Sequence, residues 1–462
     1  MSPSATTDRR ELAFAGVARQ AELVRSGEVS PRELVETALE RIGRLDRDLN
    51  AFRVVFDDRA LLEADQAGGR AFGSDDRPLL GVPIAVKDDM AVAGTPRVSG
   101  SRAHGPDEPQ DCELVRLLRA AGAIIIGVAR TPELTLWPFT ETVQGGVTRN
   151  PWELGVTPGG SSGGPASAVA AALVAASTAS DGAGSIRIPA ACCGLFGLKT
   201  TRGLVTTAPL DEVWAGLAVY GFLTRSVADS ALLYEVATGR SLVAAARRDP
   251  GKLRIALTTK IPPGVAVRLK ADQRRATLET AELLRSLGHE VVERDPSYGL
   301  RVGPNVMVRF FSGAYAEAQT MAHRERLEPR TRRIVRAGAG ARRLLRRAIA
   351  AQASDARRIN AIFDDVDVVL SPTMPGAPLR IGRYKDCGAA RTFNAAAGVV
   401  AFAAVWNHLG NPSAAVPAGF DGGGLPLSVQ IAGPPDGDET LLSLAHQLEV
   451  ARPWADRRPP VS

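Results

Sequence analysis

Residues 157–200 read TPGGSSGGPASAVAAALVAASTASDGAGSIRIPAACCGLFGLKT, and the rest of the chain is organised around them. This stretch holds two glycine-framed serine sites, Gly-Gly-Ser-Ser-Gly-Gly at 159–164 and Gly-Ala-Gly-Ser at 182–185. The small apolar residues 165–176 between them predict a helix with Pro165 in its first turn. Glycine at this density indicates tight turns or a backbone that approaches a ligand closely. The serines therefore either stabilise turns or carry chemistry.

The two serine sites resemble the motifs of the amidase signature family of serine hydrolases. That family also has an upstream motif, found here as Gly81-Val82-Pro83-Ile84-Ala85-Val86-Lys87-Asp88. The resemblance extends over nearly the whole chain, including Thr148–Trp152 and the C-terminal segment that begins at Pro417. It implies an α/β fold, a single large domain 1–462 with a central mixed, twisted β-sheet covered by helices on both faces. Its expected parts are N-terminal helices 8–75, a signature core 79–235, a variable helical elaboration at about 300–365, and a C-terminal sheet and helix 366–452.

The composition is that of an ordinary globular protein, with 462 residues, 45% hydrophobic and 23% charged. Part of the net charge of +6 comes from the arginine-rich segment 324–347. Such a segment could bind nucleic acid, but no aromatic residues interleave with its arginines, which favours a solvated helical face. We therefore expect neither a nucleic-acid partner nor a membrane partner.

The four cysteines show neither a disulfide framework nor zinc-ligand spacing, and we expect no metal and no cofactor. The N-terminal residues lack the apolar core of a signal peptide, and the longest apolar run, 166–176, is too short to span a bilayer. These observations favour a cytoplasmic protein.

Periodicity and capping signals predict alternating helices and strands. Ser30-Pro31-Arg32-Glu33 is a helix-start signal within two amphipathic helices at 8–48. Further helices are expected at 60–71, 114–121, 165–176, 272–287, 305–350 and 439–450, and one that opens at 221–229. Strands are expected at 79–86, 123–128, 253–258, 289–293, 366–370, 412–416 and 427–431, with a loop at 131–156.

Amide hydrolysis needs a nucleophile, a base, an oxyanion site and an acid for the leaving nitrogen. The five histidines lie in no recognisable motif, and no GxSxG elbow is paired with a late histidine. A lysine can act as the base if burial keeps it neutral. Lys87 follows an apolar run, so burial is plausible; the alternative is a strand-end lysine that faces solvent or pairs with Asp88 or Asp89.

The family resemblance assigns roles to residues of both serine sites. It implies that Ser185 is the nucleophile, that Ser161 is a bridging serine after a cis Gly160–Ser161 peptide, and that Lys87 is the general base. Ser162 would position the lysine, or would cap the following helix. The backbone N–H groups of Gly182, Ala183 and Gly184 would form the oxyanion hole, and Asp181 and Arg187 would hold the loop.

Two further sets of residues are interpreted through the same resemblance. Ala183 stands where the family has glycine, and alanine would be strained there if the position needs a positive φ, although Gly182 could absorb the difference. An acyl pocket is expected from Trp137, Phe139, Trp214 and Met374, each of which could instead be a core residue.

The sequence thus predicts an amidase that hydrolyses the C–N bond of a small carboxylic-acid amide, through a seryl acyl-enzyme, to the acid and ammonia or an amine. The substrate would be a small-molecule amide, and a homodimer is left open. One alternative is the glutaminase subunit of a tRNA-dependent amidotransferase, which would need partner subunits. Another is a non-enzymatic anion-binding scaffold built on 159–164, which lacks the Gly-Lys-Ser/Thr ending of a P-loop.

Overall fold

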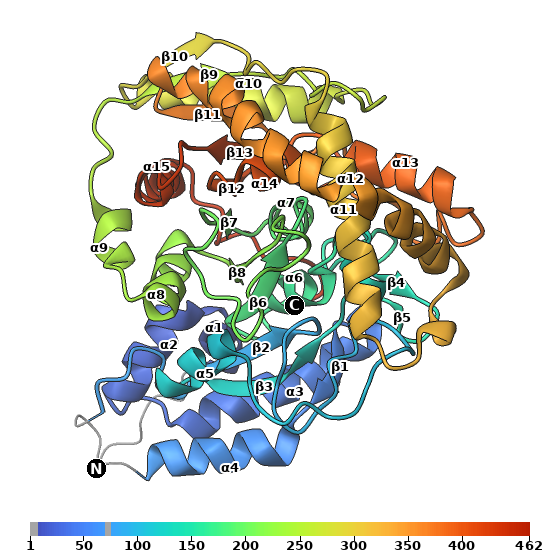
Figure 1. Ribbon diagram of the computed structural model, residues 1–462. Helices are drawn as coiled ribbons and strands as arrows, with labels where there is room; N and C mark the ends of the chain where they lie inside the picture. The colour runs from blue at the N-terminus through green and yellow to red at the C-terminus, as the bar shows by residue number, and fades with distance from the viewer. Residues whose placement is uncertain (1–7, 70–74) are drawn as a thin grey trace.

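Two mixed β-sheets form the centre of the molecule in the computed structural model, which describes residues 8–69 and 75–462 (Figure 1). The first sheet has the strand order β1-β3-β2-β6-β8 and the second the order β10-β9-β11-β13-β12-β7. Strands of the first sheet are β1 (Phe52–Val55), β2 (Pro83–Lys87), β3 (Ile124–Ala129), β6 (Ala176–Asp181) and β8 (Val219–Thr224). Strands of the second are β7 (Gly197–Lys199), β9 (Arg254–Leu257), β10 (Glu290–Glu293), β11 (Val368–Pro372), β12 (Ser413–Phe420) and β13 (Pro426–Ala432). A small ribbon of β4 (Glu141–Thr142) and β5 (Gly146–Val147) lies in the predicted loop.

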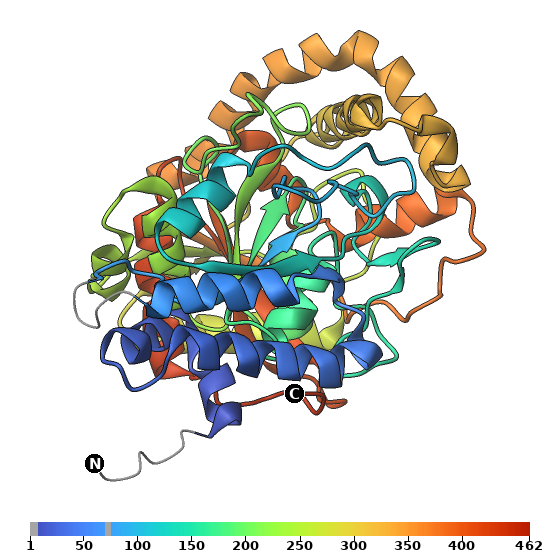
Figure 2. The ribbon, with the colours of Figure 1, turned by 90° about the horizontal axis from the view of Figure 1, so that it is seen from below.

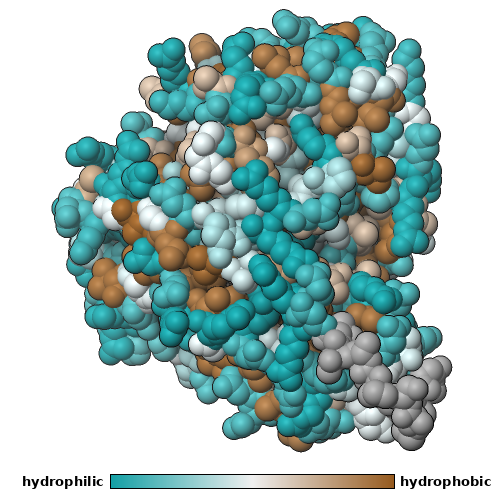
Figure 3. All heavy atoms as spheres, turned by 180° about the vertical axis from the view of Figure 1, so that it is seen from behind, coloured by the Kyte–Doolittle hydropathy of each residue, from teal (hydrophilic) through white to brown (hydrophobic). Residues whose placement is uncertain are grey.

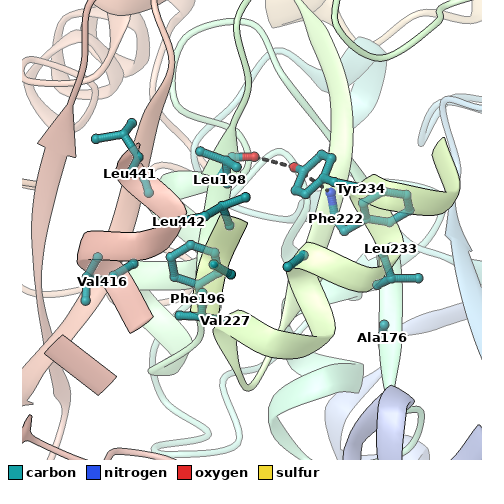
Figure 4. Packing of buried hydrophobic residues seen from close by; sticks show 14 of the residues in the cluster. Ala176, Phe196, Leu198, Phe222, Val227, Leu233, Tyr234, Val416, Leu441 and Leu442 are labelled. Carbon is teal, nitrogen blue, oxygen red and sulfur yellow. Dashed lines mark hydrogen bonds between the residues drawn. The ribbon is translucent and has the colours of Figure 1, made fainter. Parts of the chain in front are cut away.

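The two sheets meet edge to edge at β7 and β8. An antiparallel bridge joins Phe196 to Thr224. Tyr234 reinforces this joint, because its hydroxyl accepts from the Phe222 N–H of β8 and donates to the Leu198 carbonyl of β7 (Figure 4). The side chain of Tyr234 is fully buried among the residues of the main core. The central mixed sheet that was expected is therefore present as two mixed sheets, which are joined at their edges into a nearly continuous layer.

Helices cover both faces of the sheets, as expected for an α/β fold (Figures 1 and 2). One core packs residues of α2 (Gly16–Arg25), α5 (Glu113–Ala120), α8 (Val227–Thr238), α10 (Ala271–Ser286) and α15 (Asp438–Ala451) against the strands. The other packs residues of α3 (Pro31–Leu49), α4 (Asp57–Gly68), α6 (Gly163–Ala170) and α7 (Arg187–Cys193) against the opposite face. The remaining α-helices are α1 (Arg9–Phe14), α9 (Leu242–Arg247), α11 (Val302–Thr320), α12 (Pro329–Asn360), α13 (Ala389–Val399) and α14 (Ala404–Leu409).

Most predicted elements are present, with shifted ends, and the capping box of Ser30 and Glu33 at the start of α3 is confirmed. The predicted helix 165–176 is wrong in its second half, because α6 ends at Ala170 and Ala176 already begins β6. Strand β6 carries a single β-branched residue, so packing against the neighbouring strands, not local propensity, decides its conformation. The helix expected to open at 221–229 begins only at Val227, because Val219–Thr224 forms strand β8, whose valine, tyrosine, phenylalanine and threonine favour a strand. The end of the predicted helix 60–71 lies outside the described residues.

Helices α11 and α12 form a long hairpin on the outer edge of the molecule, where α12 curves around α11 (Figure 2). They pack closely at Gly338, where an added Cβ would lie 2.1 Å from the Phe311 carbonyl oxygen. The arginine-rich segment lies in this hairpin, and its arginines at 342, 343, 346 and 347 are exposed on α12, as predicted for a solvated face.

The surface is mixed in character. On the face opposite to Figure 1, hydrophilic residues cover most of the area and hydrophobic residues lie among them in groups (Figure 3). None of the helices within 8–69 and 75–462 combines the length and the apolar character that a membrane span requires.

Candidate active site

The two motifs predicted to carry chemistry meet at one edge of the first sheet. Strands β2 and β6 are parallel neighbours, and they end at Lys87 and Asp181. Because the carboxyl ends of parallel strands lie at the same edge of a sheet, Lys87 reaches the residues at the end of β6. A cavity of about 460 Å³ opens at this edge, and Ser161, Ser180 and Ser185 line it.

Lys87 is completely buried, which excludes the interpretation of a lysine that faces solvent. Its Nζ lies 2.9 Å from Ser161 Oγ, 2.6 Å from Ser180 Oγ and 3.1 Å from Asp89 Oδ2. Burial lowers the pKa of the Lys87 ammonium below its ordinary value, although the nearby Asp89 carboxylate favours the charged form. This is the environment in which a lysine can serve as a base.

The two aspartates after Lys87 have different partners. Asp88 pairs with Arg53, with 2.7 Å between Arg53 Nε and Asp88 Oδ1. Asp89 pairs with Lys87 and also accepts a hydrogen bond of 2.6 Å from Ser180 Oγ. The pairing of Lys87 with Asp89 thus coexists with burial, and Ser180 is a site residue that the sequence analysis missed.

The glycines of the first serine loop are needed because other backbone segments approach them closely. A Cβ at Gly160 would lie 2.3 Å from the Trp137 carbonyl oxygen, and one at Gly164 would lie 2.4 Å from the Arg130 nitrogen. The peptide between Gly160 and Ser161 is cis, as the family resemblance implies. This loop places the Ser161 hydroxyl beside Lys87.

Ser162 does not cap α6, and no hydrogen bond of the described residues joins it directly to Lys87. Its side chain makes no capping hydrogen bond at the start of α6, and its hydroxyl donates to the Ser180 carbonyl at 3.4 Å. Ser185 is half-buried and lines the cavity. Among the hydrogen bonds of the described residues, none joins its hydroxyl to Ser161. Its side chain is therefore presented to the cavity.

Asp181 and Arg187 form the expected ion pair, and both are completely buried. Arg187 donates to both carboxylate oxygens of Asp181 at 2.9 Å, and Asn407 from α14 donates to the Asp181 carbonyl and carboxylate. Burial alone would raise the pKa of Asp181, but Arg187 outweighs it and holds that pKa well below its usual range. The ion pair therefore holds the loop that carries Ser185.

Residues 182–184, which were expected to form an oxyanion hole, differ from that expectation in two respects. The N–H of Gly184 donates to Asp181 Oδ1 at 2.6 Å, so it is not free to bind a substrate oxygen, and only Gly182 and Ala183 of the three predicted residues line the cavity. Ala183 does not have a positive φ, so the backbone strain considered for an alanine at this position is absent. Instead Gly184 has the left-handed conformation, with φ of 117°.

This geometry predicts that alanine is tolerated at Gly182 but not at Gly184. Gly184→Ala should lower the free energy of unfolding by about 1–3 kcal/mol, since its Cβ would lie 2.7 Å from Ile188 Cδ1 at a positive φ. Gly182→Ala is the matched control, because its Cβ would meet nothing nearer than Ala218 Cβ at 3.6 Å. Chemical denaturation of both variants measures the difference, and equal losses would contradict this description of the loop.

The cavity walls are mainly apolar and come from segments far apart in the sequence. Trp137 and Trp214 line it, as predicted. Phe139 and Met374 do not: Phe139 is buried in a cluster beside Trp137 and Tyr384, and Met374 packs against Cys192. The sequence analysis missed the lining from α11 and α13, which includes Met307, Phe310, Phe393 and Ala396.

The α11–α12 hairpin supports both predicted tryptophans. Arg309 of α11 donates to the Ala215 carbonyl at 2.8 Å, and Phe310 packs against Trp214 with 5.0 Å between ring centroids. Arg330 of α12 lies over the Trp137 ring, 5.4 Å from its centroid. At least one residue of the arginine-rich segment thus supports the cavity wall.

Within the described residues, no cluster of three or more histidine, cysteine, aspartate or glutamate side chains is arranged to hold a metal ion. The four cysteines are free thiols, three of them buried. The polar side chains at this site include the hydroxyls of Ser161, Ser180 and Ser185, the Asp89 carboxylate and the Lys87 amine, which contacts Ser161, Ser180 and Asp89.

Comparison with known proteins gives consistent matches along most of the chain. The sequence model of the family described as Amidase matches residues 33–442. A Mycobacterium tuberculosis protein named "Putative amidase AmiB2" is 49% identical over 461 residues, covering 98% of this chain and 100% of the relative. The 6-aminohexanoate-cyclic-dimer hydrolase of a Pseudomonas species is 32% identical and covers 95% of each chain. A solved structure of 6-aminohexanoate cyclic dimer hydrolase complexed with substrate has a TM-score of 0.88 at 28% identity, covering 97% of this chain and 99% of that chain.

Proposed function

Since this chain belongs to the amidase family and is an amidase, a hydrolase of amide C–N bonds, we propose that Lys87, Ser161 and Ser185 perform its reaction through a seryl acyl-enzyme. The observation that carries this proposal is the contact of 2.9 Å between buried Lys87 Nζ and Ser161 Oγ at the end of a cavity that Ser185 also lines. This arrangement supports Ser185 as the nucleophile, with Ser161 and Lys87 as successive acceptors of its proton.

In the acylation half-reaction, Ser185 Oγ attacks the carbonyl carbon of the amide. Ser161 takes the proton of Ser185 and passes its own proton to neutral Lys87, so that Lys87 becomes an ammonium. As the C–N bond breaks, Ser161 returns a proton to the leaving nitrogen and is reprotonated by Lys87. Ammonia or an amine leaves, and the acyl group stays on Ser185.

In the deacylation half-reaction, water replaces the amine. Its proton follows the same route through Ser161 to Lys87 while its oxygen attacks the acyl carbon. Collapse of the tetrahedral intermediate releases the acid, and the proton returns to Ser185. The backbone N–H groups of Gly182 and Ala183 are proposed to stabilise the oxyanion in both halves, because these residues line the cavity beside Ser185.

The cavity favours an amide with a sizeable apolar acyl group. Its volume of about 460 Å³ lies in the range of pockets that enclose drug-sized ligands, and its walls away from the serines are aromatic and aliphatic. The 6-aminohexanoate cyclic dimer named for the Pseudomonas relative also carries apolar methylene chains. We propose aryl or medium-chain alkyl amides as the substrate class.

The two alternatives receive less support from the site. A glutaminase site would need polar partners for the amino and carboxylate groups of glutamine, and most of the cavity lining is apolar. An anion cradle at 159–164 would need several residues of the loop to face open space, but only Gly160 and Ser161 of this loop line the cavity.

The test is hydrolysis of a panel of amides by the purified protein. The panel contains acetamide, hexanamide, benzamide, an anilide and glutamine, and release of ammonia or amine is measured. We expect the highest kcat/KM for the apolar amides, and labelling of Ser185 by a fluorophosphonate that can be located by peptide mass spectrometry. Turnover of glutamine alone, or labelling elsewhere, would overturn the proposal.

The pocket wall gives a prediction about specificity. Phe310→Ala should lower kcat/KM for hexanamide or benzamide about 10-fold relative to acetamide, because a large apolar acyl group loses contact with the wall. Met374→Ala is the control: it should reduce stability by about 2–5 kcal/mol, as a buried core residue, without altering the acyl preference. A changed preference in the Met374 variant, or none in the Phe310 variant, would contradict this assignment of the wall.

A further inference from the structure

Lys87 Nζ has three polar contacts within 3.1 Å, two to serine hydroxyls and one to a carboxylate, and they are not equivalent. Ser161 Oγ lies at 2.9 Å on the proposed proton route. Ser180 Oγ at 2.6 Å and Asp89 Oδ2 at 3.1 Å are not needed for that route. Ser180 is also joined to Asp89 by a hydrogen bond of 2.6 Å. The three groups Lys87, Ser180 and Asp89 therefore form a closed triangle beside Ser161.

We propose that Asp89 and Ser180 are positioning residues that direct the lone pair of neutral Lys87 toward Ser161. This inference rests on the proposed function, because it concerns the base of that mechanism. It adds two residues that touch neither the scissile bond nor Ser185 in the proposed reaction.

The direction of each hydrogen bond follows from the donors available. Ionised Asp89 can only accept, and Ser180 has one hydrogen, which it donates to Asp89 Oδ2. Toward Lys87, Ser180 can therefore only accept as well. A neutral amine has two N–H groups and one lone pair, so its two hydrogens go to Ser180 and Asp89. The lone pair then points to the third partner, Ser161, which is the orientation that a base requires.

Asp89 is the carboxylate available for this task, because its neighbours have other partners. Asp88 is paired with Arg53, and Asp181 is paired with Arg187. On the other side of Asp89, Arg97 is paired with Glu317. The charged or titratable groups that act electrostatically on Lys87 or Asp89 are Asp88, Asp181, Arg97, Cys112, Tyr220 and Glu317.

The two positions should give different pH profiles. Activity requires neutral Lys87, so kcat/KM falls as the pH drops below the pKa of Lys87. The Asp89 charge favours the ammonium; in Asp89→Asn the pKa of Lys87 should fall, and the acid limb should move to lower pH by about 1 unit or more. Ser180→Ala removes no charge, so its acid limb should stay within a few tenths of a unit.

The experiment measures kcat and KM from pH 5 to 10 for these variants, per active site counted by fluorophosphonate labelling of Ser185. We expect the plateau of kcat to fall about 10-fold or more in Asp89→Asn and Ser180→Ala at unchanged KM, and Ser180→Thr to retain activity within about 3-fold because it keeps the hydroxyl. Ser177→Ala is the matched control; its hydroxyl bonds the Ala85 and Thr178 carbonyls and does not contact Lys87.

Several results would overturn the inference. Plateaus within 2-fold of the wild type in both variants would show that Lys87 needs no orientation. An unmoved acid limb in Asp89→Asn would show that Asp89 does not act on Lys87, and an equal loss in Ser177→Ala would indicate a general structural effect. None of these would disturb the proposed function, which instead fails if the wild-type enzyme is not labelled at Ser185.

Discussion

Ser185→Ala is expected to lower kcat/KM for the best amide by about 10⁴- to 10⁶-fold, the largest effect of any single change in this chain. Alanine removes the only atom that forms the covalent bond in the proposed mechanism. Ser161 cannot easily substitute, because its hydroxyl is engaged with Lys87 at 2.9 Å. The measurement is amine release under kcat/KM conditions, together with loss of fluorophosphonate labelling.

A stability measurement should show that the loss of activity in Ser185→Ala does not come from misfolding. The Ser185 side chain is half-buried at the cavity and makes no hydrogen bond found among the described residues. The free energy of unfolding of Ser185→Ala should therefore lie within about 0.5 kcal/mol of the wild-type value. Ser177→Ala is again the control, with a buried serine of the same sheet replaced outside the reaction route. Wild-type turnover in Ser185→Ala would show that another residue is the nucleophile.

Lys87→Met should reduce kcat/KM at neutral pH by about 10³- to 10⁴-fold, and should also remove the acid limb of the pH profile. Methionine has a similar length and cannot accept a proton from Ser161. The rate of the variant should therefore no longer follow the titration of a lysine. Initial rates from pH 5 to 10 test this, and a profile that keeps its acid limb would assign that limb to another group.

Lys87→Met also leaves Asp89 and Ser180 without the amine that they contact, and a buried polar group left without its partner typically costs about 1–3 kcal/mol of stability. The double variant Lys87→Met with Asp89→Asn also replaces the carboxylate, so no buried charge lacks a partner and much of that stability should return. Activity should not recover, because the base is still missing. If activity returned together with stability, the loss in the single variant would be a folding defect and Lys87 would not be the base.

Much of the active site could be predicted because its motifs are local. Each glycine-framed serine, and the lysine after its apolar strand, lies in a contiguous pattern whose backbone demands select glycine. The cis Gly160–Ser161 peptide and the Asp181–Arg187 pair were therefore expected from the resemblance and are present. The same patterns indicated the α/β fold, which the relatives share.

Other features depended on residues that carry little signal of their own. The run 165–181 is rich in alanine and serine, which suit a helix or a buried strand, so the boundary between α6 and β6 could not be placed. The requirement for a positive φ lies at Gly184 and not at Ala183, because Asp181 holds the Gly184 N–H. Neither fact follows from the spacing of residues.

The sequence by itself determined the family, the type of reaction and three of the residues proposed to carry it out. These features lie in short motifs whose backbone conformation permits few other residues. Only the tertiary structure decided that Lys87 is fully buried, that Ser180 and Asp89 contact it, and that residues of α11 and α13 line the cavity while Phe139 and Met374 do not. The physical reason is distance along the chain. Ser180 lies 93 residues from Lys87, and such contacts arise from the packing of whole elements, which no local propensity encodes.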